Sequence, residues 1–250
     1  MTAQQLRLIF EPVDPVANVY WFTHAGGGTS ALMQRFRDVD LALPVRVHSP
    51  WMPRREKLVR QAFEGDLPDL ARLMVDQIAD RQQVDSLPLV LVGHSFGGAL
   101  AFRIASELVA RGIPIHRLIV LATPSPQSEA DHRDLHSLTD SELIVEVDNL
   151  FGGIPEEILG NPDLQQLFAP ALRCDLRLLE MHRELADPID VPLTAVYGND
   201  DRQVGISRTQ GWRQWTASQF RLRSMPGDHF FPFQRTAEII QLGVWDALPG

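Results

Sequence analysis

One serine in this chain of 250 residues stands in a setting typical of a nucleophile. The stretch Gly93-His94-Ser95-Phe96-Gly97 fits the pattern G-x-S-x-G and follows a short apolar run at residues 89–92. Glycines at the outer positions allow a sharp turn between a strand and a helix, which a side chain would obstruct. Such a turn exposes the hydroxyl at a helix N-terminus, where backbone N–H groups favour developing negative charge. We therefore expect Ser95 to be a nucleophile.

A serine hydroxyl is a weak nucleophile at neutral pH and needs a histidine base that a carboxylate orients. After a strand–turn–helix serine of this kind, the acid and then the histidine follow along the chain. Among the histidines beyond Ser95, only His229 follows the last expected strand, in a loop with glycine and proline. We expect His229 to be the base. His132 and His136 stand four residues apart, but no convincing third ligand accompanies them, so we expect a solvated face and no metal.

The acid is expected in the loop Gly198-Asn199-Asp200-Asp201, directly after an apolar run at residues 193–197. Two adjacent carboxylates cannot both point at one imidazole. The spacing G-x-x-D, followed by a valine three residues later, favours Asp201 and leaves Asp200 as a turn or capping residue. Asp228 adjoins the histidine in sequence and is expected to stabilise that loop.

The tetrahedral intermediate of acyl transfer needs N–H donors for its oxyanion. One donor is the backbone N–H of Phe96, just after the serine. The glycine-rich stretch Thr23-His24-Ala25-Gly26-Gly27-Gly28, after an early apolar run, supplies the second, which we assign to the N–H of Ala25. A phosphate loop is a weak alternative, because no G-K-[ST] pattern follows the glycines.

The elements that must position these residues follow from hydrophobic patterning. Short apolar runs rich in β-branched and aromatic residues recur with helical segments between them. This predicts an α/β fold with a mostly parallel central sheet and helices on both faces. The expected strands cover residues 19–23, 45–47, 89–92, 118–122, 193–197 and 220–225.

A helical insertion is expected at approximately residues 125–188, where strand-like runs are absent. Thr139 and Glu142 form a capping-box signature, and Asn161-Pro162 is a typical helix start. The apolar face of the second helix is expected to comprise Leu164, Leu167, Phe168, Ala171, Leu172 and Leu179. An insertion between parallel strands lies near their carboxyl ends, where ligands bind in open α/β folds. We expect a lid, with additional core as the alternative.

Composition limits the remaining possibilities. The length and apolar content fit one domain spanning residues 1–250, without a membrane-spanning run. A net charge of −9 argues against nonspecific nucleic-acid binding. The N-terminus has no secretory signal pattern, so a cytoplasmic location is expected.

The single cysteine, Cys174, is expected to be a packed helix residue. The basic cluster, defined as Arg54, Arg55, Lys57 and Arg60, is expected to form a solvated helix face, or to meet an acidic partner or a phosphate.

Taken together, these motifs resemble the type II thioesterases of nonribosomal peptide and polyketide synthases, within the α/β-hydrolase fold. The resemblance covers nearly the whole chain. It is carried by Phe22-Thr23-His24-Ala25-Gly26-Gly27 as the oxyanion loop, Gly93-His94-Ser95-Phe96-Gly97-Gly98 as the nucleophile elbow, Phe151-Gly152-Gly153-Ile154-Pro155 to Arg173-Cys174-Asp175 as the lid segment, and Pro226-Gly227-Asp228-His229-Phe230-Phe231 as the histidine loop. Phe96 and Gly98 replace residues that are often methionine and alanine in that family.

The resemblance implies hydrolysis of wrong or stalled acyl thioesters on the phosphopantetheine arm of carrier proteins, in antibiotic or siderophore biosynthesis. It implies no metal and no organic cofactor, because phosphopantetheine belongs to the substrate. The expected partners are carrier protein domains, bound transiently by a monomer, with Arg54, Arg55 and Arg60 as candidate contacts. A cytoplasmic small-molecule carboxylesterase uses the same triad and is the main alternative. A scaffold that has lost catalysis is a second.

Overall fold

One mostly parallel sheet organises the protein. The computed structural model describes residues 6–41, 44–128, 134–182 and 187–244. Within them, seven strands lie in the order β1-β3-β2-β4-β5-β6-β7, and only β1 runs antiparallel to its neighbour. The strands are β1 (Leu6–Phe10), β2 (Ala17–Phe22), β3 (Val45–Pro50), β4 (Leu89–His94), β5 (Arg117–Leu121), β6 (Leu193–Gly198) and β7 (Phe220–Met225). The six expected strands are therefore confirmed, and the edge strand β1 was missed.

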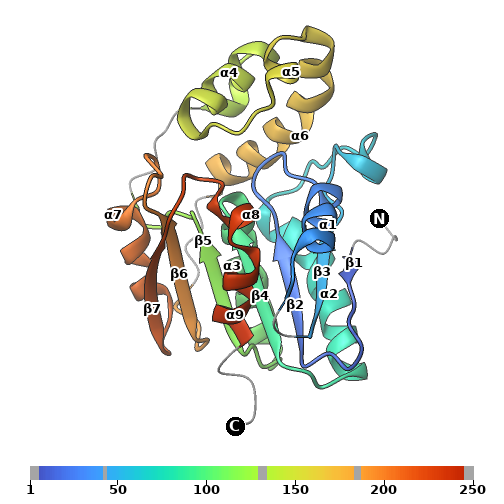
Figure 1. Cartoon of the computed structure of the whole chain (residues 1–250), viewed down its shortest axis with the longest axis vertical. Coiled ribbons are helices and arrows are strands. Elements are labelled where there is room, and N and C mark those ends of the chain that lie inside the picture. The colour runs from blue at the N-terminus through green and yellow to red at the C-terminus, as the bar shows by residue number, and fades with distance from the viewer. Residues whose placement is uncertain (1–5, 42–43, 129–133, 183–186, 245–250) are drawn as a thin grey trace.

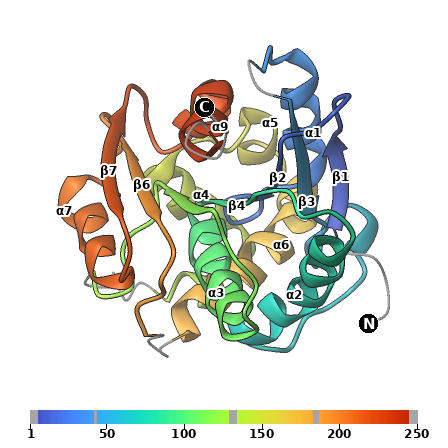
Figure 2. The ribbon, with the colours of Figure 1, turned by 90° about the horizontal axis from the view of Figure 1, so that it is seen from below.

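Helices cover both faces of the sheet, as expected. They are α1 (Thr29–Asp38), α2 (Leu67–Val84), α3 (Phe96–Ala110), α4 (Asp140–Phe151), α5 (Glu156–Leu159), α6 (Pro162–Met181), α7 (Ile206–Thr209), α8 (Phe231–Gln234) and α9 (Thr236–Val244), with short 3-10 helices η1 (Glu56–Leu58), η2 (Leu135–Ser137) and η3 (Gln210–Trp215). Figure 2 shows α2 and α3 on one side of the sheet and α1 and α9 on the other. None of the helices in the described ranges is both long enough and apolar enough to cross a membrane.

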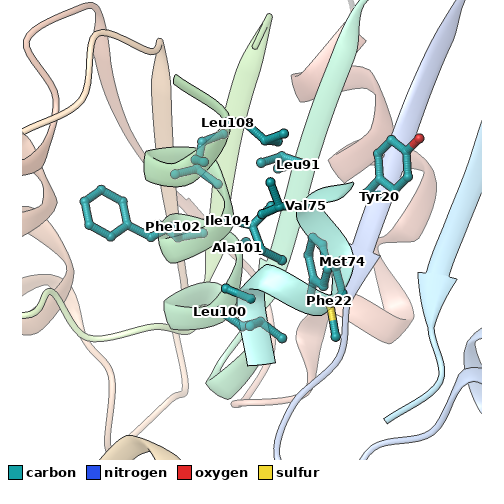
Figure 3. Packing of buried hydrophobic residues seen from close by; sticks show 14 of the residues in the cluster. Tyr20, Phe22, Met74, Val75, Leu91, Leu100, Ala101, Phe102, Ile104 and Leu108 are labelled. Atoms are coloured by element: carbon teal, nitrogen blue, oxygen red, sulfur yellow. The ribbon is translucent and has the colours of Figure 1, made fainter. Parts of the chain in front are cut away.

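The central strand β4 shows why the sequence forms a doubly covered sheet. All of its residues are buried, since successive side chains of a strand point to opposite faces and both faces are covered here. Leu89 and Leu91 pack with the core beneath α2 and α3, which Figure 3 shows from close by. Val90 and Val92 pack with the opposite core, beneath α1 and α9. Burial of each such side chain stabilises the fold by about 1.5–3 kcal/mol.

The strand order places a ligand cleft beside β2 and β4. The chain passes from β2 to β3 on one side, and from β4 to β5 on the other. Connections that diverge in this way leave a crevice at the carboxyl ends of the two strands. The glycine-rich loop after β2 and Ser95 after β4 both begin at that edge.

The helical block, defined as α4, α5 and α6, separates β5 from β6 and lies above the carboxyl ends of the strands (Figure 1). The expected caps are confirmed: Thr139 and Glu142 form a capping box, and the Asn161 side chain accepts N–H groups at the start of α6. The expected face of α6 is partly wrong. Leu164 and Leu167 are 37% and 63% exposed. Ala171 and Leu172 are buried as expected, and the buried face also includes Gln165, Ala169 and Leu176. Ala169, Leu172 and Leu176 pack with Leu143, Ile144 and Val147 of α4.

Helix α2 offers a clean test of capping. The Asp66 side chain accepts the N–H of Asp69, and the Asp69 carboxylate accepts the N–H of Asp66, although both lie at the surface. Asp66→Ala removes the first bond and should lower the free energy of unfolding by about 1 kcal/mol in urea titrations. Asp80→Ala, in the exposed interior of the same helix, is the matched control and should leave stability unchanged or slightly raised. Equal losses in both variants would contradict the capping role.

Candidate active site

A strained turn presents Ser95 between β4 and α3. Its φ of 54° and ψ of −117° lie in a region that side chains rarely adopt, and such strain costs on the order of 1–3 kcal/mol. Two backbone hydrogen bonds hold it there. The N–H of Ser95 donates to the carbonyl of Leu121 at 2.8 Å, and the N–H of Gly98 donates to the carbonyl of Ser95 at 2.9 Å. The serine is therefore fixed by the neighbouring strand β5 as well as by its own helix.

Close backbone contacts explain the glycines around the serine. A Cβ on Gly93 would lie 2.2 Å from the carbonyl oxygen of Gly97, and one on Gly97 would lie 2.2 Å from that of Phe22. These contacts are with backbone atoms that cannot swing away. Gly98 is restricted by a side chain, because its Cβ would lie 2.1 Å from Oγ1 of Thr123.

The structure brings His229 and Asp201 together. Nδ1 of His229 donates to Oδ2 of Asp201 at 2.8 Å, and both side chains are buried. Oδ1 of Asp201 accepts the N–H groups of Gln203 and Val204, each at 2.9 Å. Burial by itself raises the pKa of Asp201, but the hydrogen bonds from His229 and the two N–H groups outweigh it and hold the pKa below its ordinary value. Because the proton of the imidazole is on Nδ1, its Nε2 is free to act as a base.

The two other carboxylates near His229 have different places. Asp200 is exposed, and its N–H donates to the carbonyl of Gly227, which joins the two loops. Oδ1 of Asp228 accepts the N–H of Phe230 at 2.8 Å. The turn position predicted for Asp200 and the loop contact predicted for Asp228 both match this arrangement.

One cavity of about 440 Å³ joins the candidate site residues. Its lining includes Ser95, His229, Ala25 and Phe96, which are the predicted nucleophile, base and oxyanion donors. Asp201 lies behind His229. The sequence therefore predicted residues that the fold gathers around one space.

The interior of the cavity is mainly apolar and extends away from Ser95. Its lining includes Phe102 of α3, Trp212 of η3, and Leu172 and Leu176 of α6. Phe151, the last residue of α4, places its ring 4.7 Å from the imidazole of His229. The helical block thus forms part of the cavity wall, which agrees with the expected position of the insertion at the carboxyl ends of the strands.

Two further histidines lie near His229, and the sequence analysis gave them no role: the ring of His94 packs against that of His229, and His24 packs against His94. Nε2 of His94 donates to the carbonyl of His229 at 2.8 Å, and the ring of His24 lies 5.1 Å from that of His94. Burial, with the nearby His229 and Arg55, lowers the pKa of His24 to about 3. Burial, with His24 and His229, also lowers the pKa of His94 well below 6.5. Both rings are therefore neutral at pH 7 and support the loop that carries His229.

The glycine-rich loop contains a tight turn whose backbone is held at several points. The N–H of Gly27 donates to the carbonyl of His24 at 3.0 Å, and Gly26 takes a φ of +75° that favours glycine. Oγ1 of Thr23 donates to the carbonyl of Gly27 at 2.9 Å. The N–H of Gly26 donates to Oδ2 of Asp175 at 2.9 Å. Ala25 therefore lies between two fixed peptide groups.

The prediction of a solvated basic cluster is wrong for Arg55. This residue is 8% exposed and binds Asp175, which is fully buried, through both Nη atoms at 2.7 Å. Burial raises the pKa of Asp175, while the guanidinium and the N–H of Gly26 oppose that rise. Arg55 is unavailable as a docking contact because its charge is used inside the protein. Lys57 is exposed and lies over the ring of Trp51 at 3.7 Å.

A signal for this pair exists in the sequence. Asp175 lies on the apolar stripe of α6, between Leu172 and Leu176 and four residues from Ala171. A charged side chain on the apolar face of a helix needs a buried partner. The sequence does not say that the partner is Arg55, which stands 120 residues away.

The remaining expectations concern the histidine pair, for which no metal was expected, and the cysteine. No group of three His, Cys, Asp or Glu side chains in the described part of the chain is placed to hold a metal ion. His132 lies outside that part, and Nδ1 of His136 contacts the carboxylate of Glu180. Cys174 is buried on α6, as predicted, and its burial raises the thiol pKa to about 11.

Comparison with known proteins identifies the class. Residues 17–242 match the family described as the thioesterase domain, so the chain belongs to the thioesterase family, and its fold is the α/β-hydrolase fold. It is 28% identical to the gramicidin S biosynthesis protein GrsT of Aneurinibacillus migulanus, over 89% of this chain and 86% of the relative. It is 31% identical to a probable cadicidin biosynthesis thioesterase of Streptomyces griseus, over 92% of this chain and 62% of the relative.

Within the thioesterase family, the chain is similar in structure to a type II thioesterase. YbtT, a type II thioesterase from the yersiniabactin nonribosomal peptide and polyketide pathway, is 25% identical, with a TM-score of 0.85 over 96% of both chains. The type II thioesterase resemblance read from the motifs is therefore confirmed.

The buried histidines predict a specific pH dependence. The ring signals of His24 should remain those of neutral imidazole down to about pH 4 in NMR titrations, because its pKa is about 3 in the folded protein and about 6.5 when unfolded. Between those values the unfolded chain binds the extra proton, so the free energy of unfolding should decrease as the pH falls below 6.5, by about 1.4 kcal/mol per pH unit for one such histidine. The same signals in urea, titrating near pH 6.5, are the control. Titration of His24 near 6.5 in the folded protein would contradict the assignment.

Proposed function

We propose that this protein is a type II editing thioesterase that hydrolyses wrong or stalled acyl groups from phosphopantetheinyl carrier proteins of a nonribosomal peptide or polyketide synthase. The observation that carries the proposal is the His229–Asp201 hydrogen bond, together with a mainly apolar cavity that both Ser95 and His229 line. Membership of the thioesterase family supplies the reaction type. The names of the relatives supply the pathway context.

In the proposed mechanism, Oγ of Ser95 attacks the thioester carbonyl while Nε2 of His229 takes the hydroxyl proton. Asp201 keeps the imidazole in the required tautomer and stabilises its charged form. The N–H groups of Ala25 and Phe96 stabilise the oxyanion, and each such donor contributes about 2.7–4 kcal/mol to the transition state. The thiol leaves with the proton from His229. Water, activated by the same histidine, then hydrolyses the acyl-serine.

The apolar cavity is the proposed acyl chamber. Phe102, Trp212 and Leu176 would pack along the acyl chain, and Phe151 of the helical block would lie over the reacting carbonyl beside His229. We propose that the insertion at approximately residues 125–188 acts as a lid over this chamber. The phosphopantetheine arm then enters at the boundary between the block and the sheet.

Several finer features belong to the same proposal. The reaction needs no metal and no organic cofactor, because the triad and two N–H groups supply the base, the nucleophile and the oxyanion donors. The carrier protein docks transiently to a monomer in the cytoplasm. A small-molecule carboxylesterase could use the same triad, so substrate preference decides between the two functions.

The first test compares hydrolysis of acetyl-phosphopantetheinyl carrier protein with that of an oxygen ester of matched acyl length. The wild type should release acetate from the carrier preferentially, and Ser95→Ala should abolish release by removing the nucleophile. Equal or better turnover of the oxygen ester would favour the carboxylesterase. Full activity in Ser95→Ala would refute the proposed mechanism.

The second test separates the two adjacent carboxylates. Asp201→Asn should lower kcat by on the order of 10⁴-fold, since an amide cannot hold the tautomer of His229 that leaves Nε2 free. Asp200→Asn is the matched control, with the same change one residue away on an exposed side chain, and should keep kcat within about threefold of the wild type. The opposite pattern would assign the acid to Asp200.

A further inference from the structure

The buried carboxylate of Asp175 lies where helix α6 meets the glycine-rich turn. Its Oδ2 accepts three N–H groups: the backbone N–H of Gly26 at 2.9 Å and both Nη atoms of Arg55 at 2.7 Å. The residue is fully buried, and α6 packs directly on the turn, because a Cβ at Gly26 would lie 3.1 Å from the ring of Phe168. The helical block therefore contacts the turn through a charged group and not through apolar packing alone.

The hydrogen bonds around the turn determine the orientation of the Ala25 N–H. In a planar trans peptide, the N–H points opposite to the carbonyl of the preceding residue. The carbonyl of His24 is fixed by the N–H of Gly27, so the N–H of Ala25 is directed away from that bond. The peptide on the other side of Ala25 is fixed by Asp175 through the N–H of Gly26. Without Asp175, the N–H of Gly26 would lose this acceptor, and the second peptide group would lose the hydrogen bond that fixes its orientation.

The end of the same loop is held by the residue next to Arg55. The carboxylate of Glu56 accepts the N–H groups of Thr29 and Ser30 at 3.1 and 2.6 Å, at the start of α1. Arg55 and Glu56 thus contact both ends of the loop, one through Asp175 and one directly. The loop is clamped between α6 and this short segment.

We propose that Asp175 is a positioning residue for the oxyanion hole, which holds the Ala25 N–H in its productive direction through Gly26 and thereby couples the helical block to catalysis. This rests on the proposed role of Ala25. Arg55 neutralises the carboxylate, so that a negative charge close to the developing oxyanion does not oppose it. Asp175 does not contact the substrate, and its effect is transmitted through the backbone of the turn.

Two double variants separate hydrogen bonding from charge and stability. Arg55→Met/Asp175→Leu replaces the buried pair by apolar side chains of similar volume, a change that proteins often tolerate without loss of stability. Arg55→Met/Asp175→Asn differs from it only at residue 175, where the amide oxygen can still accept the N–H of Gly26. Asp85→Asn is the control for loss of a paired carboxylate, because Asp85, at the end of α2, binds Arg46 at the start of β3, far from the turn.

The readouts distinguish the oxyanion hole from the acyl chamber. They are kcat and KM on a short p-nitrophenyl ester and on the matched thioester, the inhibition constant of an alkylboronic acid, and the dissociation constant of a thioether analogue. The boronic acid forms a tetrahedral adduct with Ser95 and places an oxygen in the oxyanion hole. The thioether lacks the carbonyl and reports only on the chamber. Urea unfolding verifies that each variant is folded.

We expect Arg55→Met/Asp175→Leu to lower kcat by about 10- to 100-fold with little change in KM, since a small misplacement of a catalytic group has effects of this size. The inhibition constant of the boronic acid should rise by a similar factor, and the thioether should bind as tightly as it does to the wild type. Arg55→Met/Asp175→Asn and Asp85→Asn should keep kcat within about threefold.

Equal kcat in the two double variants would overturn the proposal. Weaker binding of the thioether, in parallel with weaker binding of the boronic acid, would also overturn it. Failure of the wild type to cleave the thioester would refute only the thioesterase function. The oxygen ester and the boronic acid would still compare the two double variants.

Discussion

Close contact between three backbone segments at Ser95 is the constraint on which the rest of the site depends. The turn after β4 packs against the end of β2 so tightly that Gly97 has no room for a Cβ beside the carbonyl of Phe22. On the other side, β5 accepts the N–H of Ser95. Because β2 is held this close, the glycine-rich loop that follows it lies beside the serine. The proposed oxyanion donors and the proposed nucleophile are therefore positioned by one packing arrangement.

Charge is distributed unevenly around His229, and this distribution suits general base catalysis. Hydrogen bonds keep Asp201 ionised beside His229, while burial keeps His24 and His94 neutral. A cationic ring next to His229 would disfavour its protonated form and lower its strength as a base. The two neutral imidazoles instead provide packing and one hydrogen bond to the loop. The only imidazole of this cluster with a carboxylate partner is the one placed to move protons.

The helical block does more than cover the apolar cavity. It supplies walls of the cavity through Leu172, Leu176 and Phe151, and it also supplies the carboxylate that holds the N–H of Gly26. A displacement of α6 would change the cavity and the turn together, because α6 lines the cavity and its Asp175 accepts the N–H of Gly26 in the turn. The cavity wall and the hydrogen bond to the glycine-rich turn therefore share one structural element.

The sequence by itself determined what depends on neighbouring residues: six of the strands, the turn at Ser95, and the caps of α4 and α6. It also indicated Asp201 and His229, because chain order and spacing restrict the choice. The edge strand β1, the buried face of α6 and the Arg55–Asp175 pair were decided only by tertiary structure. Their partners are distant in sequence, and the energy that fixes them comes from burial and from pairing a charge inside the fold. Local spacing indicates at most that the charge of Asp175 is buried, and it does not identify a partner 120 residues away.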